Sequence, residues 1–187
     1  MKELLEQGGV RFGSVETTSE RQAVETFICF HAMKTQGCLP PPSEGDLIAA
    51  WLDGVVVGCT ALDFRNGSER FPVEELYEEG ALERLFPDGL RRSRIVQGGR
   101  WFSSLPRSPV SRGLTCAVRS HVEQRGITLL IGEAKSYVFK RKQEWGWRIT
   151  WDEHSFPDIS RVAPEGRKYY ETPPSPHLFC LDLRSVV

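Results

Sequence analysis

The chain has 187 residues, with 24 lysines and arginines against 25 aspartates and glutamates, and 40% of its residues are hydrophobic. This composition is typical of one globular domain, and we expect a single domain over residues 1–187 that folds without a metal ion or disulfide. The formal net charge of −1 excludes the broad positive field of a protein that binds nucleic acid non-specifically or adheres to an acidic membrane surface.

The cysteines and the N-terminal segment indicate a cytoplasmic protein. The five cysteines form no CxxC pair and have no regular spacing, which argues against both a zinc site and a disulfide framework. Reduced thiols are typical of the cytoplasm. The start Met1–Gly9 is too short and too acidic for a signal peptide, and no apolar stretch approaches the ~20 residues of a membrane span. We therefore expect a cytoplasmic protein with no membrane span.

The first half of the chain predicts an edge strand, a helix and a hairpin. Residues 11–15 alternate as in a strand, and apolar positions at three- and four-residue spacing predict a helix over residues 20–34. Residues 48–62 contain two β-rich runs around the pair Asp53-Gly54, which is typical of a tight hairpin turn. The charged stretch 71–86 predicts one or two short surface helices.

The second half alternates strands and helices. Strands are predicted at residues 93–102, 127–131 and 177–183, helices at residues 114–124 and 134–144, and a turn from the second helix into a strand at residues 145–151. The pair Gly98-Gly99 inside a strand indicates either a β-bulge or the close approach of a ligand or another backbone. The order of elements predicts a mixed α/β (α+β) fold with one central sheet and helices on both faces.

Four short motifs carry a resemblance to a known family. They are the hairpin Trp51–Gly58, the stretch Phe71–Tyr77, the strand segment Gln97–Phe102, and Gly126-Ile127 with the later Trp145-Gly146-Trp147. Over about residues 15–150 they resemble the GNAT acyltransferases, in particular the branch of acyl-homoserine lactone synthases and N-acyl amino acid synthases. The resemblance implies a single GNAT-like domain whose central sheet is twisted.

The resemblance also implies an N-acyltransferase with no covalently bound cofactor. Its acyl donor would be acyl-CoA or a phosphopantetheine thioester on acyl carrier protein, and its acceptor a small-molecule amine such as an amino acid. In this fold the strand at 96–103 splays from its neighbour, and backbone groups near Arg100, Trp101, Phe102 and Ser103 would bind the pantetheine arm. A backbone N–H there would polarise the thioester carbonyl. The implied catalytic positions are Gln97, Trp101, Phe102 and Ser103.

The segment after this strand occupies the place of the family's anion cradle, in which backbone N–H groups at a helix start bind phosphate. The implied donor-binding residues are Arg100, Arg107, Arg112, Gly113, Leu114 and Thr115. Thr115 stands where a second glycine is expected, and such a reduced cradle suits the single phosphate of phosphopantetheine. Ordinary solvated arginines are the alternative interpretation of Arg107 and Arg112.

Departures from the family pattern keep other functions open. The catalytic glutamate of the autoinducer synthases falls on Gln97, which cannot take a proton at neutral pH. The tyrosine that many acetyltransferases use as general acid falls on Lys142, and Ala61 replaces an expected arginine. The alternatives are an acetyl-CoA-dependent N-acetyltransferase and a catalytically inactive GNAT-fold protein that binds an acyl donor or a protein partner.

Other residues of the chain are candidates for the missing proton acceptor and for an acyl pocket. Candidate proton acceptors are Asp63, His31, His121 and His154, and each residue type is more often a solvated or core residue at such positions. Candidate acyl-pocket residues are Phe27, Phe30, Met33, Trp101, Trp145, Trp147 and Trp151, which are equally typical of a core. Seven arginines between Arg91 and Arg119 predict a local basic surface suited to a phosphate or an acidic carrier protein.

Overall fold

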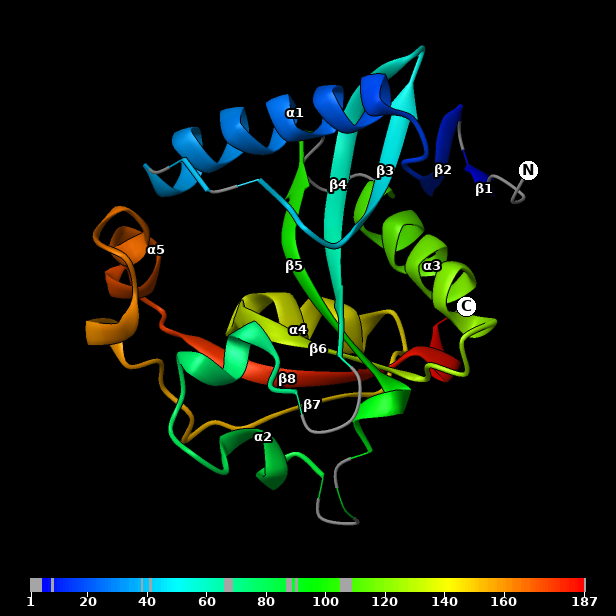
Figure 1. Cartoon of the computed structure of the whole chain (residues 1–187). Coiled ribbons are helices and arrows are strands. Elements are labelled where there is room, and N and C mark those ends of the chain that lie inside the picture. Colours follow the sequence, from blue (N-terminus) through cyan, green and yellow to red (C-terminus); the bar gives the residue numbers. More distant parts are fainter. Residues whose placement is uncertain are drawn as a thin grey trace. The chain divides into compact units, whose positions relative to one another are not determined.

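The computed structural model describes residues 5–7, 9–37, 39–40, 42–65, 69–86, 89, 91–104 and 109–186. The chain forms two compact units, of which the first comprises Met1–Asp63 and Gly98–Arg125 and the second Phe64–Gln97 and Gly126–Val187. Each unit combines strands with helices, so the mixed α/β character that the sequence predicts is confirmed (Figure 1).

The first unit is built on an antiparallel meander. Its strands are β1 (Leu5–Gln7), β2 (Val10–Ser14), β3 (Asp46–Leu52) and β4 (Val55–Phe64), followed in hydrogen-bonding order by β5 (Ile95–Ser103). The predicted hairpin joins β3 to β4. Asp53 and Gly54 have φ angles of 50° and 79°, so both lie in the left-handed region that a two-residue hairpin turn needs.

Two helices pack on the strands of this unit. Helix α1 (Thr18–Gln36) starts at a capping box formed by Thr17 and Glu20, and its buried Val24 and Ile28 pack in one cluster with Leu47, Ala49, Trp51 and Cys59. Helix α3 (Val110–Glu123) contacts β2 and β3. An added Cβ on its Gly113 would lie 2.3 Å from the ring of the buried Phe12, so only glycine permits this approach.

The second unit has a mixed set of strands. The first three residues of β5, Ile95–Gln97, pair in parallel with β6 (Leu129–Lys135), which pairs antiparallel with β8 (Pro176–Asp182) over its whole length. Strand β7 (Ile149–Trp151) lies antiparallel to β8. The hydrogen-bonded order in this unit is therefore β5-β6-β8-β7.

Both faces of these strands are covered. Helix α4 (Ser136–Glu144) places the buried Phe139 on Trp151 and Phe179, at ring distances of 5.1 and 5.6 Å. The opposite cluster joins Ile95, Ile131, Leu178 and Cys180 to Phe71, Val73, Tyr77, Ala81 and Leu82. The latter residues come from the segment that holds a 3₁₀ turn (Pro72–Glu75) and helix α2 (Ala81–Arg84). Helix α5 (Arg167–Glu171) precedes β8.

Three sequence predictions about this architecture are wrong in detail. Stretch 71–86 forms two short helical segments as expected, but it is not only a surface element, since Phe71, Tyr77 and Leu82 are almost fully buried in the second unit's core. Helix α3 begins at Val110, four residues before the predicted start. Strand β6 continues to Lys135, so α4 begins at Ser136 and the intervening residues belong to the strand.

Candidate functional site

Gln97 is the last residue of β5 that pairs with β6, where it lies opposite Ile131. Its side-chain Oε1 accepts a hydrogen bond of 3.0 Å from the backbone N–H of Val73. Side chains two residues apart on a strand point to the same face, so Glu133 of β6 follows Ile131 on the face that packs against Tyr77. The position that the resemblance assigns to catalysis therefore lies beside a carboxyl group on the neighbouring strand.

Glu133 is held by two tyrosine hydroxyls. The Tyr77 hydroxyl donates to Oε2 at 3.2 Å, and the Tyr170 hydroxyl of α5 donates to Oε1. Tyr77 is fully buried, whereas Glu133 and Tyr170 keep part of their surface exposed. Burial raises the pKa of Tyr77 above its usual value, and the nearby Glu133 raises it further, so this hydroxyl keeps its proton and acts as a donor.

The carboxyl group of Glu133 titrates near neutrality. Desolvation raises the pKa of Glu133 from 4.5 to about 7, although the hydrogen bonds from Tyr170 and Tyr77 act in the opposite direction. A carboxyl group with this pKa exists in both protonation states at neutral pH, which is the property required of a general base. Nothing in the charge pattern of the sequence marks Glu133, because its two partners are 56 and 37 residues away.

Lys135 lies two residues after Glu133 and on the same strand face. Only 7% of its surface is exposed, and its Nζ donates a hydrogen bond of 2.7 Å to the backbone oxygen of Thr172. The same Nζ lies 4.9 Å from the ring centroid of Tyr169. Desolvation lowers the pKa of Lys135 below its usual value. Helix α5 and the residue after it thus contact both charged groups of β6.

A buried ion pair fixes the segment that carries Val73 and Tyr77. Both oxygens of Glu74, which is 6% exposed, accept hydrogen bonds from Arg92, at 2.5 and 2.7 Å. Burial alone would raise the pKa of Glu74, but Arg92 and the N–H of Phe71 lower it below its usual value. Arg92 is therefore a structural residue of the second unit.

The remainder of β5 belongs to the first unit and contains a local backbone irregularity. Arg100 has a φ of 51°, a conformation that non-glycine residues seldom adopt. The backbone oxygens of Gly99 and Arg100 accept from the Thr60 hydroxyl at 2.9 Å and the Cys59 thiol at 3.8 Å. The irregularity lies one residue after Gly98-Gly99. Trp101, Phe102 and Ser103 follow it and are partly buried.

The guanidinium of Arg100 contacts groups within the first unit, since it lies 3.9 Å from Glu25 and donates to the Pro42 oxygen at 3.4 Å. Arg107 lies outside the described residues. Arg112, Gly113, Leu114 and Thr115 fall within the first two turns of α3, where Leu114 and Thr115 are fully buried. Of this group Arg112 keeps part of its surface exposed.

The other predicted proton acceptors have structural surroundings. His121 Nε2 lies 2.8 Å from Asp46, which also pairs with Arg125 at 3.0 Å. His31 lies against Phe27 with a ring distance of 4.2 Å, and desolvation lowers its pKa. Lys142 is 4% exposed, with its Nζ 5.1 Å from the Trp147 ring. Asp63 belongs to the first unit, and in the described part of the chain His154 is not among the hydrogen-bond partners of Glu133.

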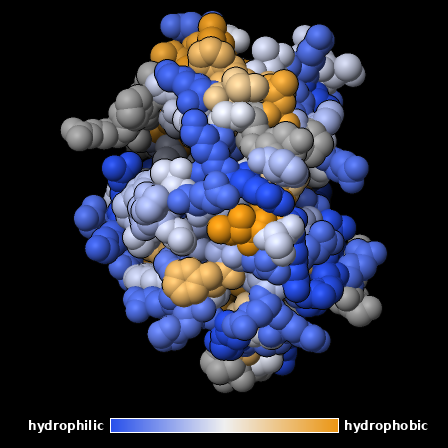
Figure 2. Space-filling model, turned by 90° about the vertical axis from the view of Figure 1, so that its left-hand side faces the viewer, coloured by the Kyte–Doolittle hydropathy of each residue, from blue (hydrophilic) through white to orange (hydrophobic). Residues whose placement is uncertain are grey.

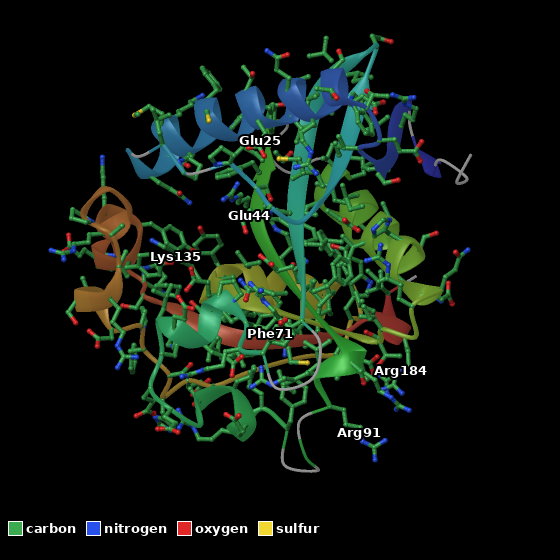
Figure 3. The ribbon with its side chains drawn as sticks, viewed as in Figure 1. Glu25, Glu44, Phe71, Arg91, Lys135 and Arg184 are labelled. Atoms are coloured by element: carbon green, nitrogen blue, oxygen red, sulfur yellow. The ribbon has the colours of Figure 1, made fainter. Side chains whose placement is uncertain are left out.

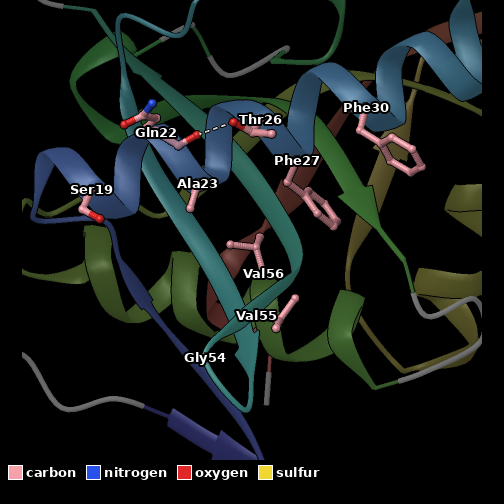
Figure 4. A pocket seen from close by; sticks show the side chains of 9 residues that line it. All are labelled: Ser19, Gln22, Ala23, Thr26, Phe27, Phe30, Gly54, Val55 and Val56. Atoms are coloured by element: carbon pink, nitrogen blue, oxygen red, sulfur yellow. Dashed lines mark hydrogen bonds between the residues drawn. The ribbon is translucent and has the colours of Figure 1, made fainter.

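An apolar groove lies on the first unit. Phe27 and Phe30 of α1 line it with Val55 and Val56 of β4, and its volume is about 720 Å³ (Figure 4). Phe30 is 63% exposed, so the groove is open to solvent. The molecular face in Figure 2 is mainly hydrophilic with separated apolar patches. Among the described residues, no helix is both long and apolar enough to cross a bilayer.

Comparisons with known proteins identify the architecture. The LasI structure, an AHL synthase, matches with a TM-score of 0.58 at 14% identity, covering 98% of this chain and 91% of that one. BjaI, a CoA-dependent acyl-homoserine lactone synthase with bound SAM and isopentyl-CoA, matches with a TM-score of 0.62 at 15% identity over 94% and 84%. FeeM, an N-acyl amino acid synthase from uncultured soil microbes, matches with a TM-score of 0.59 at 13% identity over 95% and 93%.

The chain has the GNAT acyltransferase fold. The resemblance seen in the sequence motifs is thereby confirmed at the level of the fold. No protein-family description matches the sequence, and no curated protein matches it. Gln97 and Glu133 lie on adjacent parallel strands of this fold.

Proposed function

We propose that this GNAT-fold chain transfers an acyl group from a CoA or phosphopantetheine thioester to the amine of a small acceptor such as an amino acid. The observation that carries the proposal is Glu133, a partly buried carboxyl group that titrates near neutral pH and is held by two tyrosine hydroxyls. An amine that attacks a thioester must lose a proton, and Glu133 supplies the acceptor that Gln97 cannot.

The resemblance in the sequence assigns the acyl donor to the β5 segment of the first unit. There it implies that a backbone N–H near Trp101, Phe102 or Ser103 polarises the thioester carbonyl, where negative charge develops during attack. The resemblance assigns the phosphate of the donor to the start of α3, where Arg112 adds a positive charge. Arg107 is proposed for the same role from the sequence. Gly113, Leu114 and Thr115 have a packing role at this helix start. Gly113 lies against the Phe12 ring, and Leu114 and Thr115 are fully buried.

The reaction is a direct transfer without a covalent enzyme intermediate. The Glu133 carboxylate takes one proton from the acceptor ammonium, and the free amine attacks the thioester carbon to form a C–N bond. The tetrahedral oxyanion collapses, the C–S bond breaks, and the released thiolate takes the second amine proton. Regenerating the carboxylate releases the first proton to solvent, so one amide, one thiol and one proton result from ammonium and thioester.

Release of free thiol tests the proposal directly. Acetyl-CoA and palmitoyl acyl carrier protein are offered as donors across a panel of amines, with Glu133→Gln as the test variant and Glu144→Gln on the exposed end of α4 as the control. Loss of Glu133 as general base lowers kcat about 10²–10⁴-fold. We expect wild-type kcat/KM to rise through about pH 7 as Glu133 ionises, and the variant to lose this dependence.

The groups around Glu133 do not obscure this titration. Burial raises the pKa values of Tyr77 and Tyr169, so both keep their protons far above neutral pH, and the Tyr170 hydroxyl donates to the carboxylate. Lys135 is the neighbouring basic group on β6, and desolvation lowers its pKa. Gln97 on β5 and Leu178 on β8 carry no charge. Activity of Glu133→Gln equal to that of wild type would contradict the role of Glu133. Donor binding without turnover in wild type would favour the inactive binding protein, and Arg112→Ala should weaken that binding.

A further inference from the structure

Among the residues that the structure describes, Lys135 is a buried cation with a single hydrogen-bond acceptor. An ammonium group has three N–H donors, and those residues provide Lys135 with one hydrogen bond, to the Thr172 oxygen, together with the face of the Tyr169 ring. Within the described part of the chain, no carboxylate forms an ion pair with it. A buried charge without a counter-ion is costly to a fold, so an anionic ligand would find both unused donors and an uncompensated charge.

Glu133 and Lys135 form a pair of opposite charges on one strand face. Residues two apart on a strand are separated by about 6.6 Å, and the two side chains are held by different partners, Glu133 by Tyr77 and Tyr170 and Lys135 by Thr172. Figure 3 shows Lys135 beside α5. Because α5 supplies Tyr170 and is followed at once by Thr172, the same short element positions both groups.

We propose that Lys135 binds the carboxylate of an α-amino acid acceptor whose amine delivers its proton to Glu133. The inference rests on the proposed function and names the acceptor-selecting residue of that site. Both side chains leave the same strand face, so the amine and the carboxylate of one amino acid can each form a charge-assisted hydrogen bond, the amine with Glu133 and the carboxylate with Lys135. The ammonium group of the amino acid thus faces the Glu133 carboxylate, and its carboxylate faces the Lys135 ammonium.

An acceptor amine without a carboxylate leaves the positive charge of Lys135 without a counter-ion. Hydrogen bonds to charged groups contribute about 1.5–3 kcal/mol, which corresponds to a preference of about 10–150-fold for the amino acid over its decarboxylated amine. Lys135 therefore acts on selectivity between acceptors, whereas Glu133 acts on both acceptors equally. This difference separates the two roles experimentally.

The test compares two matched acceptors, L-phenylalanine and phenethylamine, with the acyl donor that gives the fastest thiol release. Lys135→Met keeps the length of the side chain and removes the charge, Lys135→Arg restores a cation, and Lys140→Met on the exposed face of α4 is the matched control. We expect Lys135→Met to lower kcat/KM for phenylalanine about 10–150-fold while that for phenethylamine changes less than about threefold. Lys135→Arg should recover part of the loss.

Each outcome bears on the inference. Equal losses for both acceptors in Lys135→Met, or no loss for either, would overturn it. If wild-type protein releases no thiol with any amine, the proposed function fails, and calorimetric titration of phenylalanine and phenethylamine tests the carboxylate contact by itself. Weaker binding of phenylalanine alone in Lys135→Met supports the contact, and identical affinities refute it. Circular dichroism of the three variants identifies any that fail to fold, and Lys135→Gln, which also removes the charge, then takes the place of Lys135→Met.

Discussion

Glu133 shows how a proton acceptor can be present where the expected one is absent. The autoinducer-synthase resemblance places a catalytic glutamate at position 97, where this chain has glutamine, and the glutamine oxygen accepts from the Val73 N–H. Glu133 lies on the same face of the adjacent parallel strand, two residues beyond the partner of Gln97. The carboxyl function is therefore displaced by one strand, and its surroundings raise the pKa toward neutrality.

The raised pKa of Glu133 predicts a pH-dependent stability difference. Because the folded-state pKa of about 7 exceeds the usual 4.5, the folded protein holds the Glu133 proton more tightly than the unfolded chain does. The associated stability is fully present below about pH 4.5 and is lost as the pH rises through 7. Glu133→Gln has no carboxyl group to ionise and does not suffer this loss. Its free energy of unfolding minus that of wild type should therefore increase between pH 5 and pH 8, by at most about 3 kcal/mol.

Urea unfolding of wild type and Glu133→Gln at pH 5 and pH 8 measures this difference. Glu144→Gln is the control, and its stability relative to wild type should be the same at both pH values. A Glu133→Gln difference that does not grow between pH 5 and 8 would show that the carboxyl group is not desolvated as described.

At the scale of elements, the close packing of α3 against β4 depends on Gly58. An added Cβ at this position would lie 2.5 Å from the Val110 side chain and 3.2 Å from the backbone oxygen of Phe102. The same Cβ at Gly99 of β5 would meet nothing within 4 Å. We therefore expect Gly58→Ala to lower the free energy of unfolding by about 1–3 kcal/mol and Gly99→Ala to change it much less. Thermal unfolding of both variants measures the contrast, and equal effects would contradict it.

The elements also show what the sequence could predict. The hairpin at Asp53-Gly54, helix α1 and strand β8 follow from local turn chemistry and periodicity, and these predictions are confirmed. The strand character of Glu133 and Lys135 could not be predicted, because a polar pair after an apolar run reads locally as the start of a helix. Their place in β6 depends on pairing with Leu178 and Pro176 of β8 and on partners in distant segments.

Stretch 71–86 shows the same limit. Its charges, which include Glu74 and Glu75, predict a surface, yet Phe71, Tyr77 and Leu82 are buried. Glu74 is compensated by Arg92, an ion pair that local sequence does not specify. Of the candidate site, the motifs single out Gln97 and the β5 segment, whose roles stay predictions, whereas no motif singles out the carboxyl group that supplies the proposed chemistry.

At the scale of the whole molecule, neither compact unit is continuous in sequence. The chain passes from one unit to the other after Asp63, Gln97 and Arg125. If the second unit alone unfolded, residues 64–97 would become a flexible loop whose two ends are held by the folded first unit. Holding these ends together costs about 3 kcal/mol of chain entropy. Connectivity therefore couples the two units energetically.

We expect one cooperative unfolding transition. Tryptophan fluorescence and far-ultraviolet circular dichroism should give coincident urea curves, and Gly58→Ala in the first unit and Arg92→Ala in the second should each shift that single curve. Two separated transitions, with each variant moving only one of them, would show that the units unfold independently.

The spacing of Glu133 and Lys135 has a consequence for recognising other proteins with this site. Because strand side chains alternate, one inserted or deleted residue between them would send one charge to the opposite face. The tripeptide Glu-x-Lys at the end of this strand, with a Tyr-Tyr pair some 35 residues downstream as at Tyr169-Tyr170, is thus a compact genomic signature. GNAT-fold sequences that keep the signature should share this acceptor preference even where position 97 is not acidic.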